Sequence, residues 1–194
     1  MKIYYFPMAC SPADHIALQE AGVEFESERV DLGTKLTASG RNFREINAKG
    51  YVPALELDNG EVLTENIAIL DWIASQFPKL GLPGEMGRTR LIEALTYIST
   101  ELHRSFKPMW SSGSEQEMAE ARAAILMRLE FLSEKFKGDY MFGENPSVAD
   151  FYLFVMLLWA ERYMLDVPKQ LAIFRERMKS RAAVRVVMAL EGLI

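Results

Sequence analysis

The chain has 194 residues, of which 49% are hydrophobic and 25% charged, and these are the proportions of a globular protein with a buried core. They exclude a mainly disordered chain. The net charge of -5 provides no overall field that attracts polyphosphate, so no nucleic-acid partner is expected. Because Cys10 is the only cysteine, an intrachain disulfide and a multi-cysteine zinc site are excluded, and a reducing, cytoplasmic location is favoured.

The N-terminal residues alternate between strand-like and helix-like patterns. Residues 2–6 are β-branched and aromatic and predict a strand, while residues 12–21 predict a helix that stops at Gly22. Residues 25–30 predict a second strand. A strand, a helix and a strand in this order indicate a parallel βαβ unit.

The next segment is expected to complete a small mixed sheet with helices on both faces. A helix of uncertain limits is predicted before Gly50. Residues 52–63 form two short apolar runs around an Asn-Gly turn and indicate a hairpin. A helix over 67–77 follows, with Thr64 or Asn66 as its cap.

Two prolines and two glycines in residues 78–84 mark a linker, and only helical patterns follow it. These patterns cover residues 91–106, 115–136, 147–160, 170–180 and 183–190. The apolar run 151–160 is about half the ~20 residues that cross a bilayer, so a buried helix and no membrane partner are expected. Ser147 and Asp150 have the spacing of a capping box at its start. We expect an α/β domain over 1–78 and an all-α domain over 86–194.

Cys10 is the first candidate for chemistry because it follows a strand and precedes a helix start. Unpaired N–H groups and the helix dipole would stabilise a thiolate there, although a lone cysteine can also be buried and inert. Ala13 excludes a C-x-x-C dithiol. His103 shares a polar helical stripe with Thr96, and a solvated face is the alternative interpretation. His15 and His103 are far apart in the chain, so no metal site is expected.

Several motifs in order resemble the cytosolic glutathione S-transferases, most closely the bacterial beta class. They are Ala9-Cys10-Ser11, Asn47-Ala48-Lys49-Gly50, Val52-Pro53-Ala54-Leu55, Leu63-Thr64-Glu65-Asn66-Ile67-Ala68-Ile69, Thr100-Glu101-Leu102-His103 and Ser147-Val148-Ala149-Asp150. Each motif alone is weak, but together they span the chain. The resemblance implies a thioredoxin-like N-terminal domain and an all-α C-terminal domain.

The resemblance also implies a glutathione site with a cis peptide bond before Pro53. The implied site residues are Lys35, Tyr51, Val52, Pro53, Glu65, Asn66, Thr96, Glu101 and Arg104. Backbone groups of Val52 would pair with the cysteinyl part of the tripeptide, and Glu65 and Asn66 would hold its γ-glutamyl end. The chain departs from the family at Asn66 (often Ser or Gly), Thr96 (often Asn) and Arg104 (often Lys).

The implied activity is conjugation of the glutathione thiol, stabilised by Cys10, Ser11 and His103, to hydrophobic electrophiles. Met109, Trp110 and Trp159 would line the electrophile pocket, although aromatic side chains at such positions more often serve packing. The family implies a homodimer and a role in detoxification. Two alternatives stay open: glutathione-dependent thiol–disulfide exchange or peroxide reduction through Cys10, and a non-catalytic binding module.

Overall fold

The computed structural model describes all 194 residues, and its N-terminal part is built on a four-stranded sheet. The strands are β1 (Lys2–Tyr5), β2 (Glu26–Arg29), β3 (Ala54–Glu56) and β4 (Val62–Thr64), in the spatial order β2-β1-β3-β4. β1 is parallel to β2 and antiparallel to β3, and β3 and β4 form an antiparallel hairpin. The predicted βαβ unit and hairpin are therefore confirmed.

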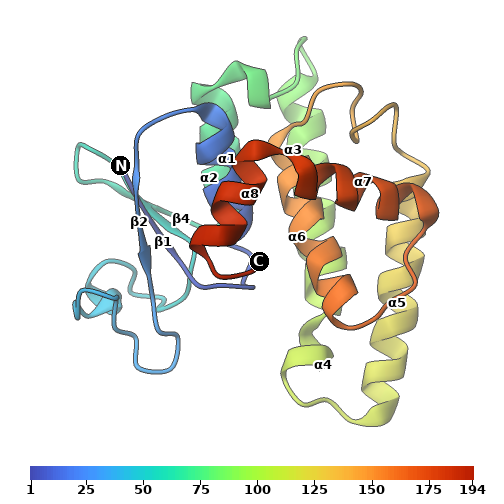
Figure 1. The fold of residues 1–194 in the computed structure, drawn as a ribbon, viewed down its shortest axis with the longest axis horizontal. Coiled ribbons are helices and arrows are strands. Elements are labelled where there is room, and N and C mark those ends of the chain that lie inside the picture. The colour runs from blue at the N-terminus through green and yellow to red at the C-terminus, as the bar shows by residue number, and fades with distance from the viewer.

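The two faces of the sheet are covered differently because side chains alternate along each strand. Ile3 and Leu55 face the main core with the helices α1 (Pro12–Ala21) and α2 (Asn66–Gln76). Tyr4 and Ala54 belong to a smaller cluster on the opposite face, together with Phe43. Figure 1 shows α1 and α2 between the sheet and the helical part of the molecule.

Two expectations for this region are wrong. The helix predicted before Gly50 is a single 3-10 turn, η1 (Phe43–Glu45), so helices do not cover both faces of the sheet. Only Phe43 of that turn is buried, which leaves no apolar stripe to hold a longer helix. The N-cap of α2 is Glu65, at φ 76°, rather than Thr64 or Asn66.

The remainder of the chain is helical, as the sequence predicts. After the short turn η2 (Pro78–Leu80), the elements are α3 (Gly87–Tyr97), the π-helix η3 (Ile98–His103), α4 (Lys107–Trp110), α5 (Glu115–Ser133), α6 (Val148–Arg162), α7 (Lys169–Ser180) and α8 (Ala182–Leu190). The N-cap of α6 is Ser147, whose N–H and hydroxyl both donate to the Asp150 carboxylate at 2.8 Å. This confirms the predicted start of that helix.

One continuous core joins the two parts of the chain. All residues of α6 from Val148 to Ala160 are buried, and α6 contacts α1. Helix α8 returns from the helical region to lie against α1, as Figure 1 shows. Forty buried residues from both parts form a single cluster, so the division into 1–78 and 86–194 stays a prediction. None of the helices combines the length and apolar composition that crossing a membrane requires.

Candidate functional site

Two adjoining cavities meet at Cys10, Tyr51 and His103, which line both of them. The polar cavity has a volume of about 430 Å³, and its other lining residues are Val52, Pro53, Glu65, Asn66, Ile67, Ser99, Thr100, Arg104 and Tyr152. The aromatic cavity has a volume of about 860 Å³, and its other lining residues are Phe6, Pro7, Met8, Ala9, Leu32, Trp110, Trp159, Arg162, Tyr163, Gly192 and Leu193. A ligand in the polar cavity therefore sits beside one in the aromatic cavity.

Cys10 lies between β1 and α1, as the sequence predicts, but its ionisation differs from the expectation. Burial raises the pKa of the Cys10 thiol to about 12, and the Asp14 carboxyl group one turn along α1 contributes to this rise. In the free protein, burial therefore affects the pKa of Cys10 more than the N-terminus of α1 does. The sulfur is a neutral thiol at pH 7, able to donate a weak hydrogen bond to an anion in either cavity.

Ser11 does not reach the cavities. Its side chain is fully buried, and its hydroxyl accepts a hydrogen bond from the Phe6 N–H at 3.1 Å and donates to the Phe6 carbonyl at 3.3 Å. Both bonds close the loop between β1 and α1. The Ser11 hydroxyl thus holds the loop that positions Cys10, and a direct role at the glutathione sulfur stays a prediction.

The peptide bond between Val52 and Pro53 is cis, as the resemblance implies. Neither the N–H nor the carbonyl of Val52 makes a hydrogen bond within the chain, although its side chain is buried. The preceding carbonyl, of Tyr51, accepts from the Asn47 side chain at 2.7 Å, which fixes this segment. Val52 thus presents an unpaired donor and acceptor at the polar cavity, suited to an extended peptide.

The N-terminus of α2 opens into the same cavity and carries a carboxylate. Glu65 accepts hydrogen bonds from the Lys49 ammonium and from the Tyr51 hydroxyl, the latter at 2.7 Å. These two bonds lower the pKa of Glu65 below its usual value. The first N–H groups of the helix have no intrahelical acceptor. An ammonium at Glu65 and a carboxylate at the helix N-terminus would both be stabilised here.

Asn66 lines the cavity directly beside Glu65. Asn66 is buried, with 8% of its surface exposed. Neither the nitrogen nor the oxygen of its amide has a hydrogen-bond partner in the chain. A buried amide without partners is costly, and a polar ligand would satisfy it. The departure from the family at this position therefore keeps a donor and an acceptor in the site.

His103 lies at the junction of the cavities and is held by a tyrosine from α6. Its Nδ1 is 2.7 Å from the Tyr152 hydroxyl. Burial lowers the pKa of His103 to about 4, and burial raises that of Tyr152, so both groups are neutral at pH 7. The imidazole packs edge-on against Trp110 and Trp159. A neutral imidazole in this setting acts as a hydrogen-bond partner rather than as a cation.

The aromatic cavity contains two of the three residues expected at the electrophile pocket. Trp159 is buried and donates from its indole nitrogen to the Met8 carbonyl at 2.9 Å, whereas Trp110 is 47% exposed. Their rings meet edge to face, with centroids 4.8 Å apart. Gly192 and Leu193, from the end of the chain, form another part of the wall.

Besides Ser11, four of the expected residues line neither cavity. Met109 packs against the main core, and Thr96 is exposed on α3. Glu101 pairs with Arg128 at 3.2 Å, and the side chain of Lys35 runs beside Gly50. Arg104 does line the polar cavity.

Sequence reasoning gave no role to Lys49 or Tyr152. Lys49 belongs to the motif Asn47-Ala48-Lys49-Gly50, which indicates no role for its side chain, and Tyr152 belongs to an apolar run that indicates a buried core. Each acts through a partner far along the chain, so no local spacing could have identified it.

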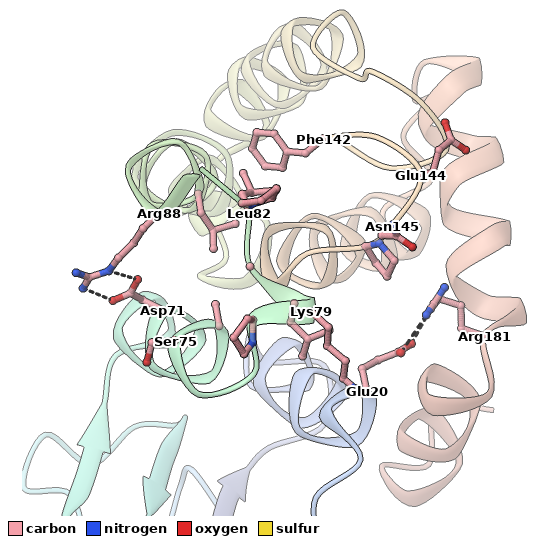
Figure 2. A pocket seen from close by; sticks show the side chains of 17 residues that line it. Glu20, Asp71, Ser75, Lys79, Leu82, Arg88, Phe142, Glu144, Asn145 and Arg181 are labelled. Carbon is pink, nitrogen blue, oxygen red and sulfur yellow. Dashed lines mark hydrogen bonds and ion pairs between the residues drawn. The ribbon is translucent and has the colours of Figure 1, made fainter. Parts of the chain in front are cut away.

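A third cavity, of about 820 Å³, lies between the two parts of the chain and shares no residue with the other two. Figure 2 shows that its arginines are already paired across it, Arg88 with Asp71 and Arg181 with Glu20. These ion pairs tie α2 to α3 and α1 to the start of α8. No group of three or more His, Cys, Asp and Glu side chains is placed to hold a metal ion.

Comparison with known proteins agrees with this geometry. Residues 13–76 match the model of the glutathione S-transferase N-terminal domain, and residues 92–182 match that of the C-terminal domain. The glutathione S-transferase GstA of Escherichia coli O157:H7 is 37% identical, with each chain covered completely.

Two solved structures are similar over nearly the whole chain. A ternary complex of BphK, a bacterial glutathione S-transferase, has a TM-score of 0.93 and 41% identity, covering 99% of this chain and 100% of that one. A sphingomonad glutathione S-transferase complexed with glutathione has a TM-score of 0.90 and 38% identity, with both chains covered completely. The thioredoxin-like and helical arrangement is confirmed, and the chain belongs to the glutathione S-transferase family.

Proposed function

We propose that this chain is a beta-class transferase that joins the sulfur of reduced glutathione to hydrophobic electrophiles. Glutathione occupies the polar cavity and the electrophile occupies the aromatic cavity. The observation that carries this proposal is the convergence of the unpaired Val52 backbone, the α2 N-terminus and the Glu65 carboxylate on one cavity beside Cys10. Glutathione matches this set because it is a peptide with both an ammonium and a carboxylate at its γ-glutamyl end. A bound glutathione in a solved relative supports the same assignment.

The thiol of the bound tripeptide is stabilised as a thiolate by neutral donors. The Cys10 S–H and the His103 imidazole both face the junction of the cavities. Lowering a thiol pKa from ~8.5 by about two units corresponds to ~2.7 kcal/mol, which a few hydrogen bonds to a charged sulfur supply. The thiolate then attacks the electrophile, a C–S bond forms, and the leaving group departs with its electron pair.

The finer assignments belong to the same proposal. The protein acts in the cytoplasm in detoxification and forms a homodimer. In that dimer the helix carrying Thr96, Glu101 and Arg104 reaches the site of the neighbouring subunit, and Lys35 lies near the glycyl carboxylate. Met109 supports the electrophile pocket from behind.

Calorimetric titration with reduced glutathione tests the proposal through Glu65. Glu65→Ala is expected to weaken binding by about 1.5 to 3 kcal/mol, the usual value of a hydrogen bond to a charged group. Glu61→Ala is the matched control, because Glu61 is exposed in the hairpin that precedes Glu65, bonds to Asn59 and lines neither cavity. Equal affinities for the wild type and Glu65→Ala would contradict the placement of the γ-glutamyl end.

The competing functions are separated by Cys10→Ala. Conjugation of chlorodinitrobenzene should persist at a reduced rate, because His103 and the Val52 backbone remain. Disulfide exchange needs the Cys10 sulfur to attack oxidised glutathione, forming a mixed disulfide and releasing one glutathione thiolate. The raised pKa of Cys10 disfavours that covalent route. Disulfide reductase activity of the wild type that exceeds its conjugation and is abolished in Cys10→Ala would favour the exchange enzyme, and no turnover by the wild type in either assay would favour a binding module.

A further inference from the structure

Arg162 is the only charged side chain of the Asp, Glu, Lys and Arg types that lines the aromatic cavity. It is the last residue of α6, one turn beyond the buried Trp159, and its side chain is exposed at the cavity. Its side chain forms no ion pair or hydrogen bond within the chain. The cavity thus combines aromatic walls with one free guanidinium.

Nearby carboxylates do not neutralise this group. Glu161, the preceding residue, is bound by Lys179 at 2.8 Å and by Arg175 at 3.4 Å. The neighbouring cavity, of about 530 Å³, shares Arg162 and adds Arg185, which also has no ion-pair partner. The surroundings are therefore locally positive in a chain of net charge -5.

We propose that the electrophile taken by the aromatic cavity is an aromatic compound bearing a carboxylate, and that Arg162 binds this carboxylate. The inference rests on the transferase function proposed above and specifies its second substrate. Aromatic rings accept a planar ring by edge-to-face or offset contact. A guanidinium matches a carboxylate because its N–H groups form a planar fork. Conjugation leaves the carboxylate unchanged: the thiolate displaces chloride from a ring carbon, so a C–S bond forms while a C–Cl bond breaks.

The test compares two electrophiles that share the ring and the leaving group, 4-chloro-3,5-dinitrobenzoate and its methyl ester, of which only the first is an anion. The measured quantity is the ratio of kcat/KM for the anion to kcat/KM for the ester. Arg162→Gln should lower this ratio by about two- to fivefold, mainly through KM for the anion, as expected for an exposed charged contact. Arg162→Lys should restore part of the ratio. In the wild type the ratio should fall as ionic strength rises.

Arg185→Gln is the control, because Arg185 lies at the neighbouring cavity and not at the aromatic one. It removes the same charge and should leave the ratio unchanged. A ratio that is insensitive to Arg162→Gln, or that falls equally in both variants, overturns the role of Arg162. If the ester reacts but Arg162→Gln leaves the ratio unchanged, the transferase function stands and only the role of Arg162 is lost. If neither electrophile reacts, both proposals are overturned.

Discussion

Alkylation of Cys10 by iodoacetamide is expected to be slow at neutral pH and to accelerate about tenfold per pH unit past pH 9. The reason is the burial that raises its pKa to about 12. An ordinary thiol has a pKa of ~8.5, so the thiolate fraction of Cys10 at pH 7 is lower by a factor of roughly 10^3.5. A more basic thiolate is also a better nucleophile, and this raises the reaction rate of the thiolate by a factor of about 10^1.5. The net expectation is a rate about one hundredfold below that of a free thiol.

Intact-protein mass spectrometry measures this rate without ambiguity, because the chain has one cysteine. The same chain unfolded in urea gives the reference rate, and Cys10→Ala gives the blank. Steric shielding alone would slow the reaction equally at every pH and leave the midpoint near ~8.5. A midpoint at or below that value in the folded protein would show that the helix N-terminus governs the sulfur, and the reasoning from burial would be refuted.

Two further predictions concern buried carboxylates. Asp150→Ala removes the acceptor of bonds from the Met141 N–H, the Ser147 N–H and the Ser147 hydroxyl, each at 2.8 Å. Urea unfolding should show a loss of about 3 to 5 kcal/mol, against about 0.5 to 2 kcal/mol for Ser147→Ala; equal losses would contradict a central role for the carboxylate. Burial, and then the charge of Glu191, raises the pKa of Asp14 well above its usual value, and its carboxylate has no hydrogen-bond partner among other side chains or backbone groups. The folded state then binds more protons than the unfolded state above pH ~4, so stability falls as pH rises, and Asp14→Asn should stabilise the protein more at pH ~8 than at pH ~5. If the difference in the free energy of unfolding between the wild type and Asp14→Asn does not change with pH, this linkage is excluded.

Elements with strong local signals could be predicted from the sequence. Gly22 does end α1 in the left-handed conformation, at φ 77°, and the Asn-Gly turn does join β3 to β4. The segment before Gly50 differs, because Phe43 is its only buried apolar residue and the packing of one apolar side chain does not support a longer helix. The cap of α2 was also missed, since a glutamate at positive φ has no distinctive sequence signal.

At the candidate site, the sequence predicts the positions of residues better than their ionisation and pairing. Cys10 and Glu65 were located through motifs, and both line the polar cavity. The sequence predicts the ionisation of Cys10 in the wrong direction, because it shows the local effect of the α1 N-terminus but not the burial of the sulfur. Likewise, the pairing of His103 with Tyr152 joins residues 49 positions apart and depends on how α6 packs.

The π-helical segment Ile98–His103 has a consequence for reading alignments of this family. A π-turn accommodates one residue more than an α-turn. Because the extra residue is absorbed within the turn, deleting one residue between Ile98 and Leu102 would restore α-helical geometry and leave the orientation of His103 unchanged. In a regular α-helix, by contrast, a deletion of one residue rotates every later residue by about 100°. A single-residue gap in this segment of a homologue is therefore compatible with a histidine at the junction of the cavities, whereas the same gap within α3 is not.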